Sequence, residues 1–232
     1  MRELSSKLQA VRARIASAAA KAGRPADAVR LLAVSKTRTA EDVRALYAAG
    51  QRAFGENYVQ EAEAKMAELA DLAIEWHHIG RIQSNKTRAI AERFHWAHGV
   101  TDEHQARRLS RQRPVGLPPL DVCIQVNVSN ETSKAGVALA TLEPLARTVA
   151  ALPNLRLRGL MAIPEPATDA AAQRRPFRAL RELCDRLRAR GLELDTLSMG
   201  MSDDLEAAIL EGATIVRVGT ALFGPRPAKP PA

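Results

Sequence analysis

The feature of this sequence that most constrains its fold is a regular alternation of short apolar runs with longer amphipathic stretches. Eight runs rich in Val, Ile and Leu recur along the 232 residues, and the segments between them have the apolar spacing of helices. This alternation predicts β–α units around a parallel sheet. The eight expected strands are Leu31–Ser35, Arg52–Gly55, Ile74–Gly80, Phe94–Val100, Asp121–Val128, Arg156–Ile163, Glu193–Gly200 and Thr214–Gly219.

A closed barrel is the architecture that suits these units best. Barrels of eight β–α units typically need about 250 residues, and this chain has 232. An open, doubly wound sheet is the alternative, because no sequence pattern states directly that the last strand pairs with the first. No GxGxxG motif follows any expected strand, which weighs against that alternative. We therefore predict a single α/β domain over residues 1–224, a (β/α)8 barrel of the TIM type.

Segments at the two ends of the chain fall outside the repeating units. Gly23 and Pro25 end an additional N-terminal helix, whose apolar face comprises Leu4, Leu8, Val11, Ile15 and Ala18. Residues 225–232 read PRPAKPPA, a proline-rich stretch without apolar anchors. This composition predicts a disordered tail.

Charge and cysteine content limit the possible partners. The net charge of +8 raises the question of nucleic acid, but the arginines are spread along amphipathic stretches and only 3% of residues are aromatic, so no nucleic-acid partner is expected. The chain has no apolar run of about 18 residues and no secretory signal at its start, which predicts a cytoplasmic protein without membrane insertion. Cys123 and Cys184 lack metal-ligand spacing and are expected to be buried thiols.

The expected site lies where the strands end, because a barrel builds its ligand site at the carboxyl ends of its strands. Lys36 directly follows the first expected strand. Partial desolvation at such a position makes an amine a better nucleophile toward an aldehyde. By spacing alone, a solvated lysine at the strand edge is the alternative.

Two loops near the end of the chain are suited to an anion. Ser198 and Gly200 follow the seventh strand, while Arg217, Gly219 and Thr220 end the eighth. Glycines let backbone N–H groups approach a phosphate, the two hydroxyls can donate, and a short helix starting near Thr220 would point its positive end at the anion. Turn geometry is the alternative role for the glycines. Arg217 and Gly219 are two residues apart and therefore face the same side of their strand.

Asn57 and the histidines are weighed separately. Asn57 closes the second strand and is expected either to donate to a ring oxygen or to cap a helix. His77 and His78 point to opposite faces of a strand and no carboxylate completes a ligand set, so no metal site is expected. His77, near a strand end, is expected close to a ligand. Three acids after the seventh strand are expected to cap and charge the next helix: Asp203, Asp204 and Glu206.

Seven motifs in this order resemble the pyridoxal phosphate homeostasis protein family. They are LLAVSKT, FGENYVQE, WHHIGRIQSNK, QVNVSNETSKAGV, RGLMAI, LSMGMSDD and VRVGTALFG, and they extend over nearly the whole chain. The resemblance implies a barrel similar to the N-terminal domain of alanine racemase, with pyridoxal 5'-phosphate (PLP) bound as a Schiff base on Lys36. It also implies that Ser198, Gly219 and Thr220 hold the phosphate and that Arg217 faces the pyridine nitrogen.

The function implied by this resemblance is that of a non-catalytic, monomeric carrier that buffers PLP in vitamin B6 homeostasis and hands it to PLP-dependent apoenzymes. An arginine only donates hydrogen bonds, so the ring nitrogen stays unprotonated and is a weak electron sink, which suits holding the cofactor. A racemase-like enzyme using Lys36 is the main alternative, and a lysine-dependent aldolase acting on a sugar is another. Lys86, Lys134 and Lys229 remain unassigned as possible second attachment sites.

Overall fold

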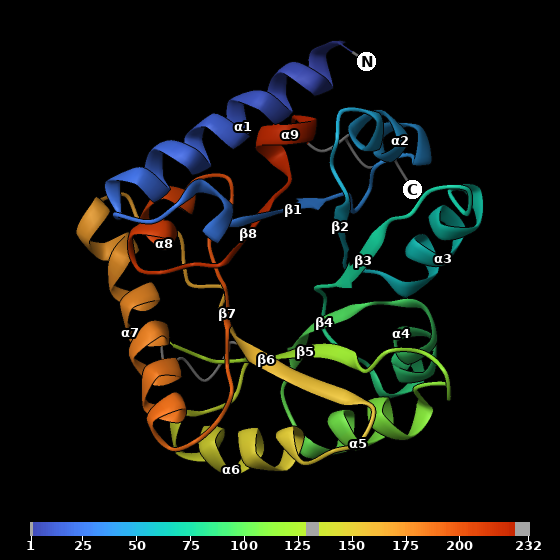
Figure 1. Ribbon diagram of the computed structural model, residues 1–232, viewed down its shortest axis with the longest axis vertical. Coiled ribbons are helices and arrows are strands. Elements are labelled where there is room, and N and C mark those ends of the chain that lie inside the picture. The colour runs from blue at the N-terminus through green and yellow to red at the C-terminus, as the bar shows by residue number, and fades with distance from the viewer. Residues whose placement is uncertain (1, 129–134, 226–232) are drawn as a thin grey trace, which may run out of the picture.

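The strands of the protein close into a parallel barrel (Figure 1). The computed structural model describes residues 2–128 and 135–225; Lys134, Lys229 and residues 226–232 of the expected tail lie outside the described residues. Strand β8 (Ile215–Val218) pairs with β1 (Arg30–Val34), so the open-sheet alternative is wrong and the barrel prediction is confirmed. The strands between them are β2 (Ala53–Glu56), β3 (Glu75–His78), β4 (Trp96–Val100), β5 (Leu120–Gln125), β6 (Leu155–Met161) and β7 (Thr196–Ser198).

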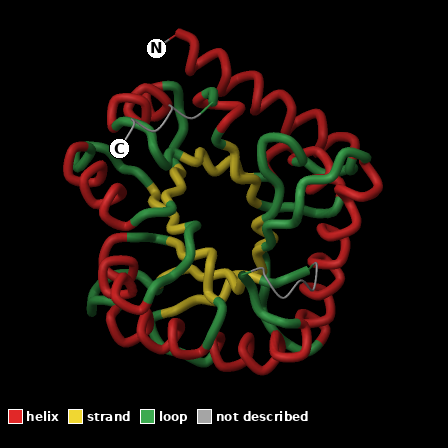
Figure 2. Tube along the Cα trace, turned by 180° about the vertical axis from the view of Figure 1, so that it is seen from behind, coloured by secondary structure: helices red, strands yellow, loops and turns green. Residues whose placement is uncertain are grey.

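Helices form a ring around the outside of the barrel (Figure 2). Among the described residues, no helix is both long enough and apolar enough to span a membrane. The helices are α1 (Arg2–Lys21), α2 (Ala40–Ala48), α3 (Val59–Glu68), α4 (Thr87–Arg93), α5 (Glu103–Gln112), α6 (Leu139–Ala150), α7 (Ala170–Ala189), α8 (Leu205–Leu210) and α9 (Thr220–Phe223), with short 3-10 turns at Ala26–Ala28 and Ser84–Lys86.

The additional N-terminal helix is present as α1. Its apolar face is buried, with Leu8 fully covered, and it packs against α8 and α9. Arg14 of α1 donates to Glu206 of α8 at 2.7 Å, which adds a polar bond to this contact. Gly23 adopts a φ of +65° just after the helix, a conformation that glycine reaches without a Cβ clash. The expected end of this helix is therefore confirmed.

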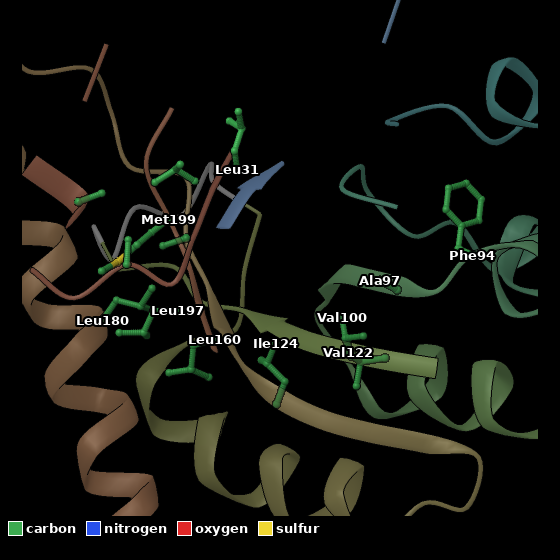
Figure 3. Close-up of a cluster of buried hydrophobic side chains, with 14 of the residues drawn as sticks. Leu31, Phe94, Ala97, Val100, Val122, Ile124, Leu160, Leu180, Leu197 and Met199 are labelled. Carbon is green, nitrogen blue, oxygen red and sulfur yellow. The ribbon is translucent and has the colours of Figure 1, made fainter. Parts of the chain in front are cut away.

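Apolar residues of the barrel form two layers, to which alternate residues of β1 contribute. Leu31 and Ala33 belong to the outer layer between strands and helices, whereas Leu32 belongs to the inner layer that fills the barrel. Figure 3 shows part of the outer layer, where Leu180 of α7 lies beside Leu197 of β7. The inner layer consists of Leu32, Val34, Ala53, Ile79, Trp96, Cys123, Met161 and Ile215.

Strands β6 and β7 lie very close together at Gly159 of β6. A Cβ built at this position would lie 1.8 Å from the carbonyl oxygen of Thr196 in β7. Real Cβ atoms do not come that close to a backbone oxygen, so any side chain would force the two strands apart. Gly159 thus sets the spacing of the strands beneath the β7 loop.

We predict that Gly159→Ala lowers the free energy of unfolding by about 2 kcal/mol or more, because backbone atoms must move to admit the methyl group. Gly55→Ala is the matched control, since its Cβ would meet only the side-chain ends of Ile79 and Leu32, at 3.1 Å and 3.3 Å. The control should cost less than about 1 kcal/mol. Urea titration of both variants measures the difference, and equal losses would contradict this account of Gly159.

Candidate functional site

A pocket opens at the carboxyl end of the barrel. It brings together five of the residues expected from the sequence, Lys36, Asn57, Arg217, Gly219 and Thr220. The other residues that line it are Val34, Ile79, Ile163, Met201, Ser202 and Asp203. A larger hollow exists at the start of β6, near Arg156, but barrels build their sites at the opposite face.

A buried ion pair holds the residue that precedes Lys36. Lys65 of α3 is only 5% exposed, and its ammonium donates to Glu56 Oε1 at 2.8 Å and to the backbone oxygen of Ser35 at 2.7 Å. The Ser35 hydroxyl donates to the same Glu56 oxygen at 2.6 Å. These bonds fix the end of β1, from which Lys36 emerges.

The residue after Lys36 has an unusual backbone conformation. Thr37 has a φ of +62°, which is strained for a β-branched residue. Its N–H donates to Glu61, which also accepts from Lys65 at 2.6 Å. Lys36 is therefore flanked by two residues that are both tied to α3. We refer to Glu56, Glu61 and Lys65 as the anchoring cluster.

Arg217 extends from β8 into the pocket, with 4% of its surface exposed. Its Nη1 donates to the carbonyl oxygen and hydroxyl of Ser198 at 2.6 Å and 2.8 Å, and Nη2 donates to the Ala162 oxygen at 2.9 Å. Burial lowers the pKa of the guanidinium to about 10, so it stays charged at neutral pH. The Nε–H and the second Nη2–H bond to no described residue, so both remain for an acceptor in the pocket.

Ser198 and His77 do not line the pocket, although both were expected near the ligand. The Ser198 hydroxyl lies 2.8 Å from His98 Nδ1 and accepts from Arg217. His77 is fully buried, and its Nε2 lies 2.7 Å from Glu75 Oε1. Both side chains are engaged inside the barrel and reach the pocket only through Arg217.

The loop after β7 contributes Ser202 to the pocket, a residue that the sequence had not singled out. Its hydroxyl oxygen accepts from the N–H of Ala221 in α9 at 3.2 Å, which links the two loops expected to bind an anion. Gly200 has a φ of +92°, and a Cβ there would lie 2.5 Å from the Cβ of Ala208. Gly200 therefore shapes this loop and does not line the pocket. Its place after a strand was compatible with either role.

One of the three acids after β7, Asp204, does not act as expected. Asp204 precedes α8 without capping it through its side chain, and instead accepts from the N–H of Met201. Glu206 lies in the first turn of α8, as expected, where its carboxylate binds Arg14. Asp203 lines the pocket. The expectation of a side-chain cap at Asp204 is therefore wrong, because its carboxylate binds the N–H of Met201 instead.

Asn57 provides a direct test of whether the pocket suits a polar ligand. Asn57 lines the pocket, and its Oδ1 is buried and has no hydrogen-bond partner in the part of the chain that the structure describes. A buried amide oxygen without a partner costs free energy, and a polar ligand group would satisfy it. Together with the donors of Arg217 and the amine of Lys36, this makes the pocket suitable for a polar ligand that carries an acceptor and a group that reacts with an amine.

Metal binding finds no support among residues 2–128 and 135–225, where no group of three His, Cys, Asp or Glu side chains is placed to hold an ion. Cys123 and Cys184 are free, buried thiols, and burial raises the pKa of both. Neither forms a disulfide or reacts as a thiolate at neutral pH.

Comparison with known families identifies the class of protein to which this fold and pocket belong. Residues 6–227 match the family model described as alanine racemase, N-terminal domain. The alanine racemase of Corynebacterium glutamicum superposes with a TM-score of 0.67 at 20% identity, over 97% of this chain and 63% of that chain, which shows a shared fold. This chain therefore has the barrel of that family.

Closer relatives narrow the class further. The pyridoxal phosphate homeostasis protein of Pseudomonas aeruginosa is 62% identical over 97% of each chain, and that of Escherichia coli K12 is 49% identical over 97% of this chain and 98% of its own. PipY of Synechococcus elongatus, solved with PLP bound, has a TM-score of 0.84 and 40% identity, over 95% of this chain and all of its own. The chain belongs to the pyridoxal phosphate homeostasis protein family.

We predict that the free energy of unfolding falls as the pH falls from 7 to 4. Burial lowers the pKa of His77 and His78 from 6.5 to about 4, so between these values the unfolded chain binds protons that the folded protein excludes. Each histidine contributes up to about 3 kcal/mol to this loss, and neither contributes above pH 7.5. Urea unfolding at pH 7.5 and pH 5 measures the effect.

His78→Leu should reduce this pH dependence, whereas His104→Leu, at an exposed position, should leave it unchanged. Identical slopes for the parent protein and His78→Leu would show that His78 is not held neutral by burial.

We also predict that Lys65→Met lowers the free energy of unfolding by about 3 kcal/mol, because it leaves the Glu56 carboxylate buried without its cation. Adding Glu56→Gln to that variant should recover part of the loss, since the unpaired charge is then removed. Chemical denaturation of the single and double variants forms the test. If the double variant is less stable than Lys65→Met alone, the ion-pair account fails.

Proposed function

We propose that this protein binds PLP as a Schiff base on Lys36 and acts in PLP homeostasis as a non-catalytic carrier. The observation that carries the proposal is that Lys36 and Arg217 line the same pocket at the carboxyl end of the barrel. The amine of Lys36 is suited to bond the aldehyde, and the guanidinium of Arg217 is suited to donate to the ring nitrogen. The PLP-bound structure of PipY, a relative that is 40% identical, supports the choice of ligand.

In this proposal the remaining pocket residues hold the other polar groups of PLP. Asn57 lines the pocket and is assigned to the phenolic oxygen, to which its amide Nδ2–H group can donate. Gly219 and Thr220 at the start of α9, with Ser202 from the facing loop, are assigned to the phosphate. Each of these residues lies on a loop that follows a barrel strand.

The three other expected residues act indirectly in this proposal. Ser198 and His77 lie beneath the pocket and influence the ring through Arg217, and Gly200 sets the path of the loop that carries Ser202. None of the three lines the pocket. Assigning them supporting roles agrees with their burial.

The absence of turnover follows from the same residues. Arginine donates hydrogen bonds and stays protonated, so the ring nitrogen that it faces must accept and remains a weak electron sink. Racemisation also needs an acid or base on each face of the substrate. Neither tyrosine of the chain lines the pocket: Tyr58 is 60% exposed, and the Tyr47 ring packs under Arg52. These observations favour a protein that holds PLP over one that uses it in catalysis.

The partners that follow from this role are PLP itself and PLP-dependent apoenzymes that receive it. Transfer needs only that an acceptor lysine displaces Lys36 from the aldehyde. We propose that the carrier works as a monomer. Light scattering of the purified protein tests this directly, and a stable dimer would contradict it.

The test of the binding site is Lys36→Ala, with Lys86→Ala as the matched control. The purified parent protein should absorb in the visible range, and borohydride should convert this adduct into a stable pyridoxyl group that peptide mass spectrometry locates on Lys36. Lys36→Ala should lose the absorbance and the adduct, whereas Lys86→Ala should keep both. An undiminished adduct in Lys36→Ala would overturn the proposal.

The carrier role is tested separately by incubating the PLP-loaded protein with single enantiomers of amino acids. We expect no chiral inversion above the rate of free PLP. Inversion that depends on Lys36 would support the racemase alternative. Loss of a sugar substrate without any bound PLP would support the aldolase alternative.

A further inference from the structure

A line of polar side chains crosses the apolar interior of the barrel. Glu75 Oε1, at the start of β3, lies 2.7 Å from His77 Nε2, and His77 Nδ1 lies 2.9 Å from His98 Nε2 in β4. His98 Nδ1 lies 2.8 Å from the hydroxyl of Ser198 in β7, which is 2.8 Å from Arg217 Nη1 in β8. Four strands thus contribute to one continuous chain of hydrogen bonds that ends in the pocket.

The direction of every bond in this chain follows from its two ends. A carboxylate can only accept, so His77 carries its proton on Nε2. A neutral His77 then has a bare Nδ1, which accepts from the Nε2–H of His98. His98 in turn has a bare Nδ1, which accepts the Ser198 hydroxyl proton. The Ser198 oxygen is left to accept from Arg217, which is the only role that an arginine allows.

Both histidines are neutral in this arrangement for physical reasons. They are fully buried and in contact with one another, so a proton on either would place a charge in the apolar interior. Burial lowers the pKa of His77 to about 4 and that of His98 well below its usual range. Burial opposes the ionisation of Glu75, but hydrogen bonds from His77 and Arg30 outweigh it and lower the pKa of that carboxyl to about 2. This chain of hydrogen bonds therefore has an anionic end at Glu75 and a cationic end at Arg217.

The chain determines which acceptors Arg217 meets. Because the Ser198 proton is committed to His98, a lone pair of the hydroxyl is presented to Nη1 of Arg217. Two carbonyl oxygens, of Ser198 and Ala162, complete the set, and none of the three acceptors is charged. If the Ser198 hydroxyl turned its proton toward Arg217, this arrangement would be lost.

We infer that Glu75, His77 and His98 are positioning residues, which through Ser198 hold Arg217 in the orientation that presents its remaining donors to the ring nitrogen of PLP. The role at the ring rests on the proposed function, whereas the direction of the chain does not. It also excludes Ser198 as a donor to the phosphate, because its single proton is already used inside the barrel.

The direction of the chain is tested on the full-length protein without added PLP. Long-range proton–nitrogen NMR of a sample labelled with 15N-histidine distinguishes the two neutral tautomers of each ring. We expect His77 and His98 both to carry the proton on Nε2 at pH 7, with signals assigned through His77→Gln and His98→Gln variants. An Nδ1–H tautomer or a charged ring at either position would overturn the inference.

The effect on Arg217 is tested with two matched variants. Glu75→Leu and Arg30→Leu both remove the ion pair between these residues, whose atoms lie 2.7 Å apart, but only Glu75→Leu removes the last acceptor of the chain. A loosened Arg217 places less positive charge beside the ring, so the pH midpoint of the visible absorption band of the Lys36 adduct should rise by about one unit in Glu75→Leu. Arg30→Leu should leave the midpoint unchanged.

This midpoint reports on the surroundings of the ring, and a loss of folding stability alone does not move it. Equal midpoints in Glu75→Leu and Arg30→Leu would show that the chain does not position Arg217, even if the parent protein forms the adduct. A parent protein without any reducible adduct would refute the proposed function instead, and the tautomer measurement would still decide the direction of the chain.

Discussion

The site depends on a guanidinium buried inside an apolar barrel. A charge in such a place is stable only when its donors meet acceptors, and Arg217 finds three of them, two on Ser198 in β7 and one on Ala162 just after β6. Those bonds fix the position of its other donors, and these donors determine what this part of the pocket can bind. Because arginine offers donors and no acceptor, it favours a ligand atom with a lone pair at this position.

The position of Lys36 is likewise set by a network of hydrogen bonds. The anchoring cluster binds the backbone on both sides of Lys36, so the lysine emerges from a rigid strand end and a strained turn. Two separate buried networks thus hold the two groups that would meet the aldehyde and the ring. Preorganisation of this kind lowers the entropy lost on binding and favours tight retention of a ligand.

The barrel and much of the pocket could be predicted from the sequence. Strand periodicity and strand-end position, which are properties of the local sequence, place Lys36, Asn57 and Arg217 at the carboxyl end of the barrel. They leave a solvated lysine and a helix cap open as alternatives for Lys36 and Asn57. Residues that act through distant partners were missed or placed too near the ligand. His98 and Ser198 are 100 residues apart and meet only in the closed barrel, and Lys65 has the i, i+4 spacing from Glu61 of an ordinary solvated helix face.

The measurement that tests the central claim most directly is the 15N NMR shift of the pyridine nitrogen in protein loaded with ring-labelled PLP. A donor-only Arg217 at this nitrogen predicts the shift of an unprotonated, hydrogen-bonded pyridine across neutral pH. The shift of a pyridinium, with its proton on the ring, would contradict the account.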